Sequence, residues 1–387
     1  MSSWWSSFLD IFLWFGMDPS DKQFAQAKAL YAEFLASNRK DFKALNGSLA
    51  NFDLALSNRR EGKDGRPHPD LETTLSTYAS VLWTRYEEKK SLSDLHKVIE
   101  LDEEACTLWE TIMDPASKPS NHANLFLDLG NAYFNQYRRN LTSSELLEKA
   151  IEKYEKLRVE TDVQRRRRGL LKLAVAFWTW YEDDEIPKTR QLKTQRLDGA
   201  IAYLHQALEA DGREILLERP EDVDGDQREI LLNLAIVYYA RYKDRKDRSD
   251  LDAAIGYNRK ARKAMTSGNR NYVYCIYDLA EQLFIQYQHE QGPKDKGEVW
   301  REQWLNANME AGKGEKELRE ARMALEEVLG DEMNSDDVLT SNAQKLLGVV
   351  KQHVDGLGKN ASRNASSATL AGGSGSSMSS RISSATK

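Results

Sequence analysis

The chain has 387 residues, a formal net charge of −6, 40% hydrophobic residues and only 8 prolines. This length suits two ordinary domains or one long repeat array. The mild acidity disfavours a nucleic-acid partner. Two cysteines outside any CxxC pair are too few for a disulfide framework, and they indicate a reducing, cytoplasmic compartment. Ala, Leu, Glu, Lys and Arg dominate, which favours helix over strand.

Residues 1–20 form an aromatic-rich N-terminal segment that contains "WWSSFLDIFLWFG" at 4–16. The run is shorter than the ~20 apolar residues that span a bilayer. We interpret it as a helix that caps the first repeat. The alternatives are a membrane-interfacial helix, which would make the protein peripheral to a membrane, and a peptide that docks in a partner's groove. The candidate docking or membrane residues are Trp4, Trp5, Phe8, Phe12 and Phe15.

Residues 21–70 are predicted to form N-terminal helices, and residues 71–355 a helical repeat array. Residues 356–387 are rich in Ser, Gly and Ala and contain almost no core-forming side chains. Such a segment cannot offset its ordering entropy, so a disordered tail is expected.

Five segments of the array share one template. They are "LSTYASVLWTRY" (75–86), "LFLDLGNAYFNQY" (125–137), "LLKLAVAFWTWY" (170–181), "ILLNLAIVYYARY" (230–242) and "VYCIYDLAEQLFIQY" (273–287). Each contains a small residue, a large apolar residue three positions later and a tyrosine four further on, as in Gly130, Tyr133 and Tyr137. This spacing is helical, and the small residue would let a partner helix approach closely.

A second phrase follows each of these segments. It reads "LHKVI" (95–99), "LEKAI" (147–151), "LDGAI" (197–201), "LDAAI" (251–255) and, more loosely, "LREARMALEEVL" (318–329). Each unit is therefore predicted to be two amphipathic helices. Because one helix pair cannot bury its apolar face alone, neighbouring pairs must stack. We predict an all-α solenoid of five to six helix pairs.

The pattern over about 70–330 resembles the tetratricopeptide (TPR) repeat. Its best copies are Leu129, Gly130 and Tyr133 with Ala150, Tyr154 and Leu157, then Leu173, Ala174 and Phe177 with Ala200, Leu204 and Ala207. The chain departs from the family in its long interhelical linkers and in lacking most of the prolines that close a repeat. It is similar to the divergent, long-linker repeats of fungal and bacterial proteins.

The resemblance implies that the first helices line a concave face that binds an extended peptide. The candidate lining is Asn124, Leu127, Asn131 and Asn135, then Arg168, Leu171, Lys172 and Val175, then Glu229, Asn233 and Ile236. Asparagines would bond a peptide backbone, and Lys172 or Arg168 would hold a carboxylate. Compared with the family's clamp for acidic chaperone tails, the leading lysine is absent and Glu229 reverses a charge, which disfavours that partner.

Motifs of catalysis and metal binding are lacking. The sequence has no P-loop, no G-x-S-x-G and no metal-spaced His/Cys cluster, so we expect no catalytic residue, cofactor or metal. The run "RRRR" (165–168) is either a contact for acidic ligands or the solvated start of a helix near Gly169. We favour the second interpretation.

We therefore predict a non-catalytic scaffold or adaptor that binds a protein or peptide of unknown identity on its concave face. Two alternatives stay open. One is a peripheral membrane adaptor tethered by residues 4–16, and the other is an accessory subunit of a catalytic partner.

Deleting residues 1–16 separates the cap from the membrane anchor. If the segment caps the first repeat, deletion should lower the thermal midpoint, because burying one large aromatic side chain contributes ~1.5–3 kcal/mol. An unchanged midpoint, together with loss of co-sedimentation with lipid vesicles, would identify an anchor instead.

Overall fold

A computed structural model describes residues 18–62, 66–111, 122–140, 143–183, 189–210, 223–265, 270–290, 313–330 and 339–355. These residues are almost entirely helical and contain no β-strand. The chain divides into two compact units, Met1–Arg213 and Glu214–Lys387. The interpretations of the aromatic segment, with Trp4, Trp5, Phe8, Phe12 and Phe15, and of the tail at 356–387 lie outside the described residues.

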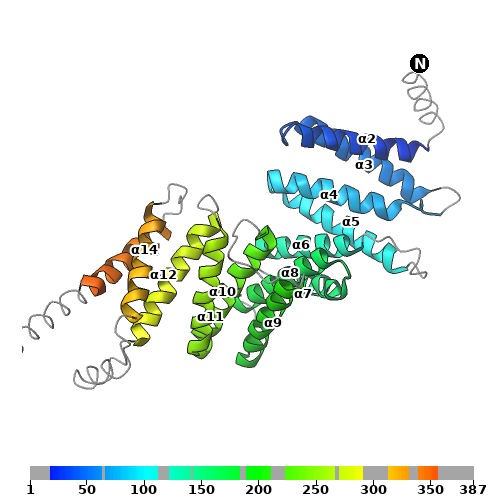
Figure 1. Ribbon diagram of the computed structural model, residues 1–387. Coiled ribbons are helices and arrows are strands. Elements are labelled where there is room, and N and C mark those ends of the chain that lie inside the picture. Colours follow the sequence, from blue (N-terminus) through cyan, green and yellow to red (C-terminus); the bar gives the residue numbers. More distant parts are fainter. Residues whose placement is uncertain are drawn as a thin grey trace, which may run out of the picture. The chain divides into compact units, whose positions relative to one another are not determined.

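Unit 1 consists of helix pairs that follow one another along the chain (Figure 1). Its elements are α2 (Pro19–Ala36), α3 (Phe42–Glu61), α4 (Leu71–Lys89), α5 (Leu92–Thr111), α6 (His122–Asn140), α7 (Ser144–Glu155), the 3-10 turn η2 (Lys156–Val159), α8 (Val163–Glu182) and α9 (Arg190–Glu209). The pairs are α2 with α3, α4 with α5, α6 with α7, and α8 with α9. The second helix of each of the first three pairs also packs against the first helix of the next.

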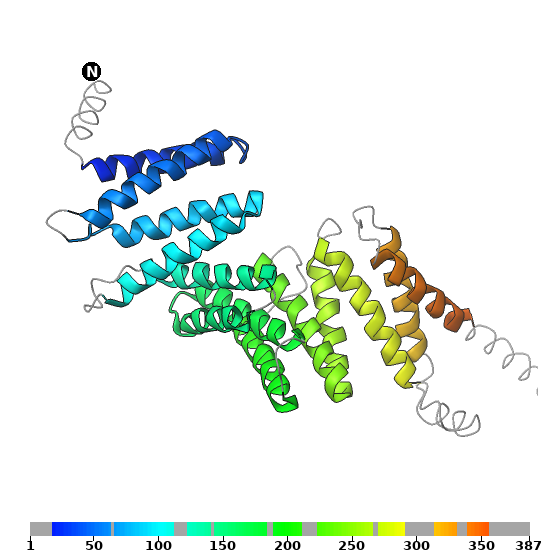
Figure 2. The same ribbon diagram turned by 180° about the vertical axis from the view of Figure 1, so that it is seen from behind.

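Unit 2 repeats this arrangement, as the view from behind also shows (Figure 2). It contains α10 (Gly225–Arg245), α11 (Arg248–Ala264), α12 (Arg270–Glu290), α14 (Lys313–Gly330) and helical residues 339–355. Helix α10 pairs with α11 and α12 pairs with α14, while α11 packs against α12. With the four pairs of unit 1, the described residues hold six helix pairs, which confirms the predicted all-α, TPR-like fold.

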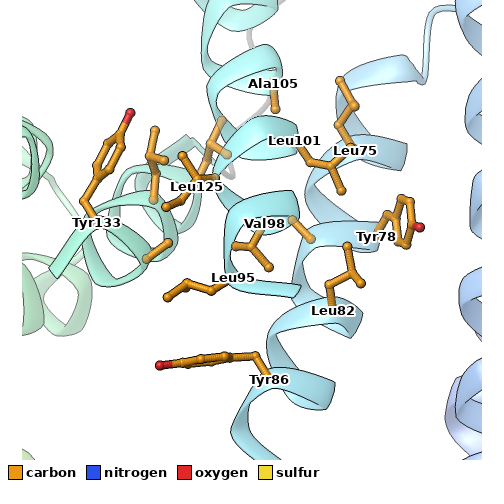
Figure 3. Packing of buried hydrophobic residues seen from close by; sticks show 14 of the residues in the cluster. Leu75, Tyr78, Leu82, Tyr86, Leu95, Val98, Leu101, Ala105, Leu125 and Tyr133 are labelled. Atoms are coloured by element: carbon orange, nitrogen blue, oxygen red, sulfur yellow. The ribbon is translucent and has the colours of Figure 1, made fainter. Parts of the chain in front are cut away.

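The template residues form the core. The small residues Ala79, Ala174, Ala235 and Ala280 are at most 2% exposed, and Gly130 is buried as well. The tyrosines that end four of the five segments are also buried, whereas Tyr181 is only half-buried. Figure 3 shows how α4, α5 and α6 share this core, with side chains that include Leu75, Leu82, Tyr86, Leu95, Val98, Leu101, Leu125 and Tyr133.

An arginine–aspartate pair joins the two helices of two hairpins in the same way. Arg85 of α4 binds Asp94 of α5 through Nε and Nη2 at 2.9 and 2.5 Å. Arg241 of α10 binds Asp250 of α11 through the same atoms at 3.0 and 2.6 Å. Both aspartates are buried and out of reach of water. The two hydrogen bonds from each arginine therefore compensate the carboxylate charge in place of hydration. The sequence carries a signal for this pair. In both hairpins an Arg-Tyr dipeptide is followed by an Asp-Leu dipeptide, and the arginine and aspartate are nine residues apart. We did not predict the pair from this signal.

A left-handed residue ends the first helix of both hairpins. Lys90 and Lys246 have φ of 55° and 58°, and each donates its backbone N–H at 2.7 Å to the carbonyl of the tyrosine four residues earlier. This conformation stops the helix and reverses the chain. The turn and the arginine pair together determine how the second helix lies on the first.

Two helix starts differ from the prediction. Helix α8 begins at Val163, not near Gly169, because the Asp162 side chain accepts the N–H of Arg165 at 2.8 Å and caps the helix. The arginine run is also not simply solvated, since Arg167 is 0% exposed. Helix α9 begins at Arg190, capped by the Thr189 side chain, so part of the long interhelical linker expected between the segments at 170–181 and 197–201 is helical. Its residues 190–196 contain neither Gly nor Pro to prevent this.

Gly130 lies at a close approach between α6 and α7. A Cβ atom at this position would come within 2.6 Å of Cε1 of Tyr154. The Tyr154 ring cannot easily yield, since it is 1% exposed and its hydroxyl donates to Oδ1 of Asn131 at 2.9 Å. Gly130→Ala should therefore destabilise unit 1 by ~1–3 kcal/mol through overpacking, a cost larger than the gain in helix propensity. Thermal unfolding would measure the change.

Gly256 provides a matched control, because it also lies inside a helix, α11, but a Cβ there would meet nothing within 4 Å. Gly256→Ala should stabilise the protein by roughly 0.5–1 kcal/mol through helix propensity alone. If both substitutions raised the thermal midpoint equally, the close-approach assignment at Gly130 would be wrong.

Candidate peptide-binding groove

A hollow of about 180 Å³ opens on the face of unit 1 formed by the first helices of three successive pairs. It is lined by Tyr31 of α2, by Glu72, Ser76, Thr77, Ser80 and Val81 of α4, and by Asn124, Leu125 and Asp128 of α6. We call this surface the groove. It belongs to the face that the TPR resemblance associates with peptide binding.

The hydroxyl groups of the groove are held by their own helix. Thr77 Oγ1 donates to the Thr73 carbonyl at 2.7 Å, and Ser80 Oγ donates to the Ser76 carbonyl at 3.0 Å. The Tyr31 hydroxyl lies 2.8 Å from Thr84 Oγ1 and so links α2 to α4. A hydroxyl that donates in this way keeps its capacity to accept a hydrogen bond. The wall can therefore accept N–H groups of a ligand.

Two carboxyl groups line the groove, and a third is buried on the helix that packs against both of theirs. Glu72 and Asp128 line it, and Asp102 of α5 lies between their helices, only 1% exposed, with no hydrogen-bond partner for Oδ2. Among the described residues, no lysine or arginine forms an ion pair with Glu72, Asp102 or Asp128. Unit 1 therefore places acidic groups at and behind the groove without a cation of its own beside them.

The pKa values of these groups reflect burial. Burial raises the pKa of Asp102 well above its usual range, and the nearby charges of Asp128 and Glu72 raise it further. Burial also raises the pKa of Asp128 to about 6, although its side chain stays open to solvent along the groove. The pKa of Glu72 is raised by burial and lowered in part by the hydrogen bond from Thr73. Ionisation is thus unfavourable for all three groups, as expected for carboxyls whose cation is absent.

Of the residues predicted on α6, only Asn124 lines the groove. Asn131 lies half-buried and accepts the hydrogen bond from Tyr154, while Asn135 Nδ2 donates to the Asn131 carbonyl at 2.8 Å. Leu127 is half-buried and packs against the core. The asparagine amides are thus partly occupied inside the helix pair, and their role in peptide binding stays a prediction.

The remaining predicted residues lie on α8 and α10. On α8, Leu171 is 1% exposed and belongs to the interior, Arg168 is exposed, and Lys172 and Val175 are half-buried. On α10, which belongs to unit 2, Glu229, Asn233 and Ile236 are half-buried, and Asn233 Nδ2 donates to the Glu229 carbonyl at 2.8 Å. The acids Glu72, Asp102 and Asp128 were not among the residues that sequence reasoning selected.

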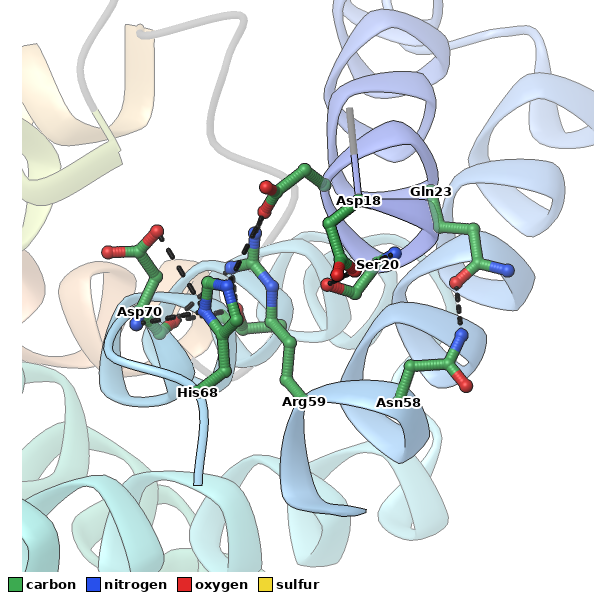
Figure 4. Close-up of polar contacts among 9 residues, drawn as sticks. Asp18, Ser20, Gln23, Asn58, Arg59, His68 and Asp70 are labelled. Atoms are coloured by element: carbon green, nitrogen blue, oxygen red, sulfur yellow. Dashed lines mark hydrogen bonds and ion pairs between the residues drawn. The ribbon is translucent and has the colours of Figure 1, made fainter. Parts of the chain in front are cut away.

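A second polar cluster, near the start of α2, contains Asp21, His68 and Asp70 (Figure 4). Their ligand-type atoms lie within 4.8 Å of one another. However, the buried guanidinium of Arg59 binds Asp21, and His68 Nδ1 accepts the Asp70 backbone N–H at 3.1 Å. Arg59 also donates to the Asp70 carbonyl at 3.3 Å, so the cluster joins α2, α3 and the start of α4. The cluster of Asp21, His68 and Asp70 is therefore a structural contact in which Arg59 supplies the positive charge.

Across the described part of the chain, none of the helices combines the length and apolar character needed to cross a membrane.

No protein-family model matches the sequence, and no curated protein matches it. Solved structures that are similar to this chain include TPR and TPR-like repeat proteins of bacteria and fungi. TTC0263, a thermophilic TPR protein of Thermus thermophilus, is 15% identical with a TM-score of 0.38, over 71% of this chain and 98% of that one. The S. pombe nuclear import adaptor Nro1 is 15% identical with a TM-score of 0.40, over 85% and 99%. The TPR2AB domain of yeast Sti1, in complex with pHSP90, is 14% identical with a TM-score of 0.26, over 86% and 98%. These values describe a likeness of repeat architecture only.

The raised pKa of Asp128 predicts a pH-dependent effect of Asp128→Asn. The folded state holds the proton more tightly than the unfolded state, because the pKa of Asp128 moves from 3.8 to about 6. The protonated Asp128 carboxyl therefore stabilises the wild-type fold. This contribution is fully present below pH 3.8 and is lost as the pH rises through about 6. Asparagine cannot ionise, so the variant should match wild type only near pH 3, below the unfolded pKa of 3.8, and should exceed it increasingly as the pH rises to about 6. At pH 7.5 the variant should melt roughly 2–4 °C above wild type. The reason is that ionised Asp128 still destabilises the wild-type fold by about 1 kcal/mol after solvent screening is taken into account.

Differential scanning fluorimetry at both pH values would measure this difference. The control is Glu145→Gln on α7, where the carboxyl is 75% exposed, and its effect should not change between the two pH values. A variant that melts below wild type at pH 7.5 would show that ionised Asp128 stabilises the fold.

Proposed function

We propose that the chain is a non-catalytic scaffold that binds an extended segment of a partner protein in the groove of unit 1. TPR-like helical repeats are commonly protein-binding scaffolds. The observation that supports this function here is the hollow shared by the first helices α2, α4 and α6, which presents hydroxyl, amide and carboxyl groups side by side.

The groove's composition suits an extended peptide better than a compact small molecule. Every peptide residue carries one backbone donor and one backbone acceptor. The Thr77 and Ser80 hydroxyls and the Asn124 amide can serve such groups along one face, while Val81 and Leu125 supply apolar surface between them. Because the groove is made by three successive pairs, its ligand would contact several repeats at once.

The two other roles stay predictions. Tethering to a membrane depends on residues 4–16, which lie outside the described residues, and an accessory role depends on a catalytic partner. Neither role conflicts with peptide binding in unit 1, since both concern what else the scaffold is attached to.

Ser80→Trp tests the proposal by filling the groove. Ser80 is exposed on α4, so an indole can be accommodated without entering the core. Proteins captured from a lysate by the full chain should be reduced at least tenfold with this variant, because the indole would occupy the space of the ligand. Quantitative mass spectrometry of the captured proteins would measure the reduction.

Thr107→Trp is the matched control, because Thr107 is an exposed hydroxyl residue on α5 that does not line the groove. It should leave capture unchanged. If Ser80→Trp retained every partner while circular dichroism showed an intact fold, the groove would not be the binding surface.

A further inference from the structure

We propose that the chain's own aromatic segment, residues 4–16, docks on the inner face of unit 1, the side of the first helices that carries the groove. It would pack there on an aromatic strip formed by Tyr31 of α2, Trp83 of α4, Phe134 of α6 and Trp178 of α8. Because Tyr31 also lines the groove, a docked segment would compete with a partner. The inference therefore rests on the proposed function and describes its regulation.

One position of the repeat template carries the aromatic strip. In each of the first helices α2, α4, α6 and α8, an aromatic residue stands four positions after the small residue, as Phe134 does after Gly130. Helix α2 follows the same rule, since Tyr31 stands four positions after the buried Ala27. All four rings are half-buried. The stacking of pairs thus repeats one partly exposed ring in every first helix of the unit.

The exposed part of the Trp83 ring lies on the inner face. Residues three or four positions away are its neighbours on the helix surface. On one side these are Ala79 and Tyr86, which are at most 3% exposed, and on the other side they are the exposed Ser80 and Glu87. Ser80 lines the groove, and Trp83 Nε1 donates to Glu87 Oε1 at 3.0 Å. The indole therefore leans toward the side that carries the groove.

The polar neighbours of the strip leave its rings uncovered. In three successive first helices, the residue after the ring donates to the backbone carbonyl four residues earlier. These bonds run from Thr84 to Ser80 at 3.1 Å, from Asn135 to Asn131 at 2.8 Å and from Thr179 to Val175 at 2.9 Å. A short side chain that bonds to its own helix does not extend over the adjacent ring. The apolar surface of the strip is thus accessible to a ligand.

Three positions of a first helix face the preceding pair, and in the interior of the array they are apolar. On α4 they hold Leu75, Tyr78 and Leu82, all at most 4% exposed. The Tyr78 ring stacks on Phe52 of α3 with a centroid distance of 5.6 Å. On α6 the last of these positions is Tyr133, whose hydroxyl donates to a glutamate of α5. Packing against a preceding helix therefore uses large apolar side chains at these positions.

Helix α2 departs from this pattern. At the same three positions it has Gln23, Gln26 and Leu30, of which Gln26 is exposed. Gln23 also accepts a hydrogen bond from Asn58 Nδ2 at 2.8 Å, which adds to the polarity of this end face. The terminal pair of a repeat array needs such a polar outer face. An apolar segment can therefore bury more of its surface on the four rings of the strip than on the end face of α2.

Residues 4–16 match the strip in chemistry and in reach. They are mostly aromatic or aliphatic and carry a single charge, on Asp10. They end shortly before Asp18, whose side chain caps α2. Tyr31 lies ~20 Å further along α2, and a 13-residue segment spans ~20 Å even if it is helical. A segment that turns back along α2 therefore reaches the strip, where its apolar side chains are removed from water.

Photo-crosslinking in the full chain tests the contact. Phe8 or Phe12 is replaced by p-benzoylphenylalanine, and the crosslinked residues are identified by mass spectrometry. We expect crosslinks to the helices that carry Trp83 and Phe134. Crosslinks to the end face around Gln26, crosslinks only to added phosphatidylcholine vesicles, or no crosslink at all would overturn the inference. So would crosslinks found only between isotopically labelled and unlabelled copies, because the segment would then occupy a second chain.

Ser80→Glu tests whether the strip is responsible. Ser80 is exposed beside Trp83, so the carboxylate stays outside the core. The crosslink yield should fall about tenfold, because a docked apolar segment would strip the carboxylate of water. Thr107→Glu, at an exposed hydroxyl residue of α5, should leave the yield unchanged. Ser80→Glu should also lower the thermal midpoint of the full chain more than that of a chain without residues 1–16, and equal shifts would contradict docking.

Partner capture separates this inference from the proposed function. Removing residues 1–16 should increase the capture of partners that are lost with Ser80→Trp, because the segment no longer competes for the groove. Capture that depends on Ser80 but does not rise on this deletion would remove the regulation and leave the proposed function intact. Capture that is independent of Ser80 in both chains would instead remove the proposed function, even if the crosslinks to the strip were found.

Discussion

The close approach of the two helices in each pair is the constraint on which the rest of the structure depends. In the α6/α7 pair it occurs where Tyr154 lies against Gly130, a position with no room for a Cβ atom. At this distance the large side chains on either side interlock, and the tyrosine hydroxyl can reach Asn131. A pair built in this way has buried only one face of each helix. Its remaining apolar surface requires the next pair, and stacking follows.

The hairpin turns fix the orientation of the second helix of a pair relative to the first. Lys90 ends α4 in a left-handed conformation, and Arg85 then binds Asp94 across the turn. The same arrangement recurs at Arg241 and Asp250 in unit 2. Because both partners are held through two atoms, the second helix has little freedom to rotate about its axis. The face that each first helix presents is thereby decided before any ligand is present.

The groove of unit 1 shows how the proposed function can be placed on such a frame. The core and the turns hold the backbone, so individual side chains around the groove can be unfavourable for stability without loss of the fold. Asp102, in the interior behind the groove, is a case in point, because its buried carboxyl lacks the arginine that its counterparts Asp94 and Asp250 have. In natural proteins, departures of this kind from local optimisation are expected at functional sites. Arg59, buried beside Asp21, is a case in which a buried charge is paired within the fold.

The sequence by itself determined the helix pairs, because a period of 3.6 residues and a small residue at a constant position suffice to show which side chains share a helix face. It could also have revealed the arginine–aspartate hairpins, whose two members are nine residues apart. Only the tertiary structure decided that Glu72 and Asp128 line one hollow, and that Asp102, Leu171 and Arg167 belong to the interior. Periodicity describes one helix at a time. Which faces of different helices meet depends on crossing geometry and on turns such as those at Lys90 and Lys246, and that information is distributed over the whole packed unit.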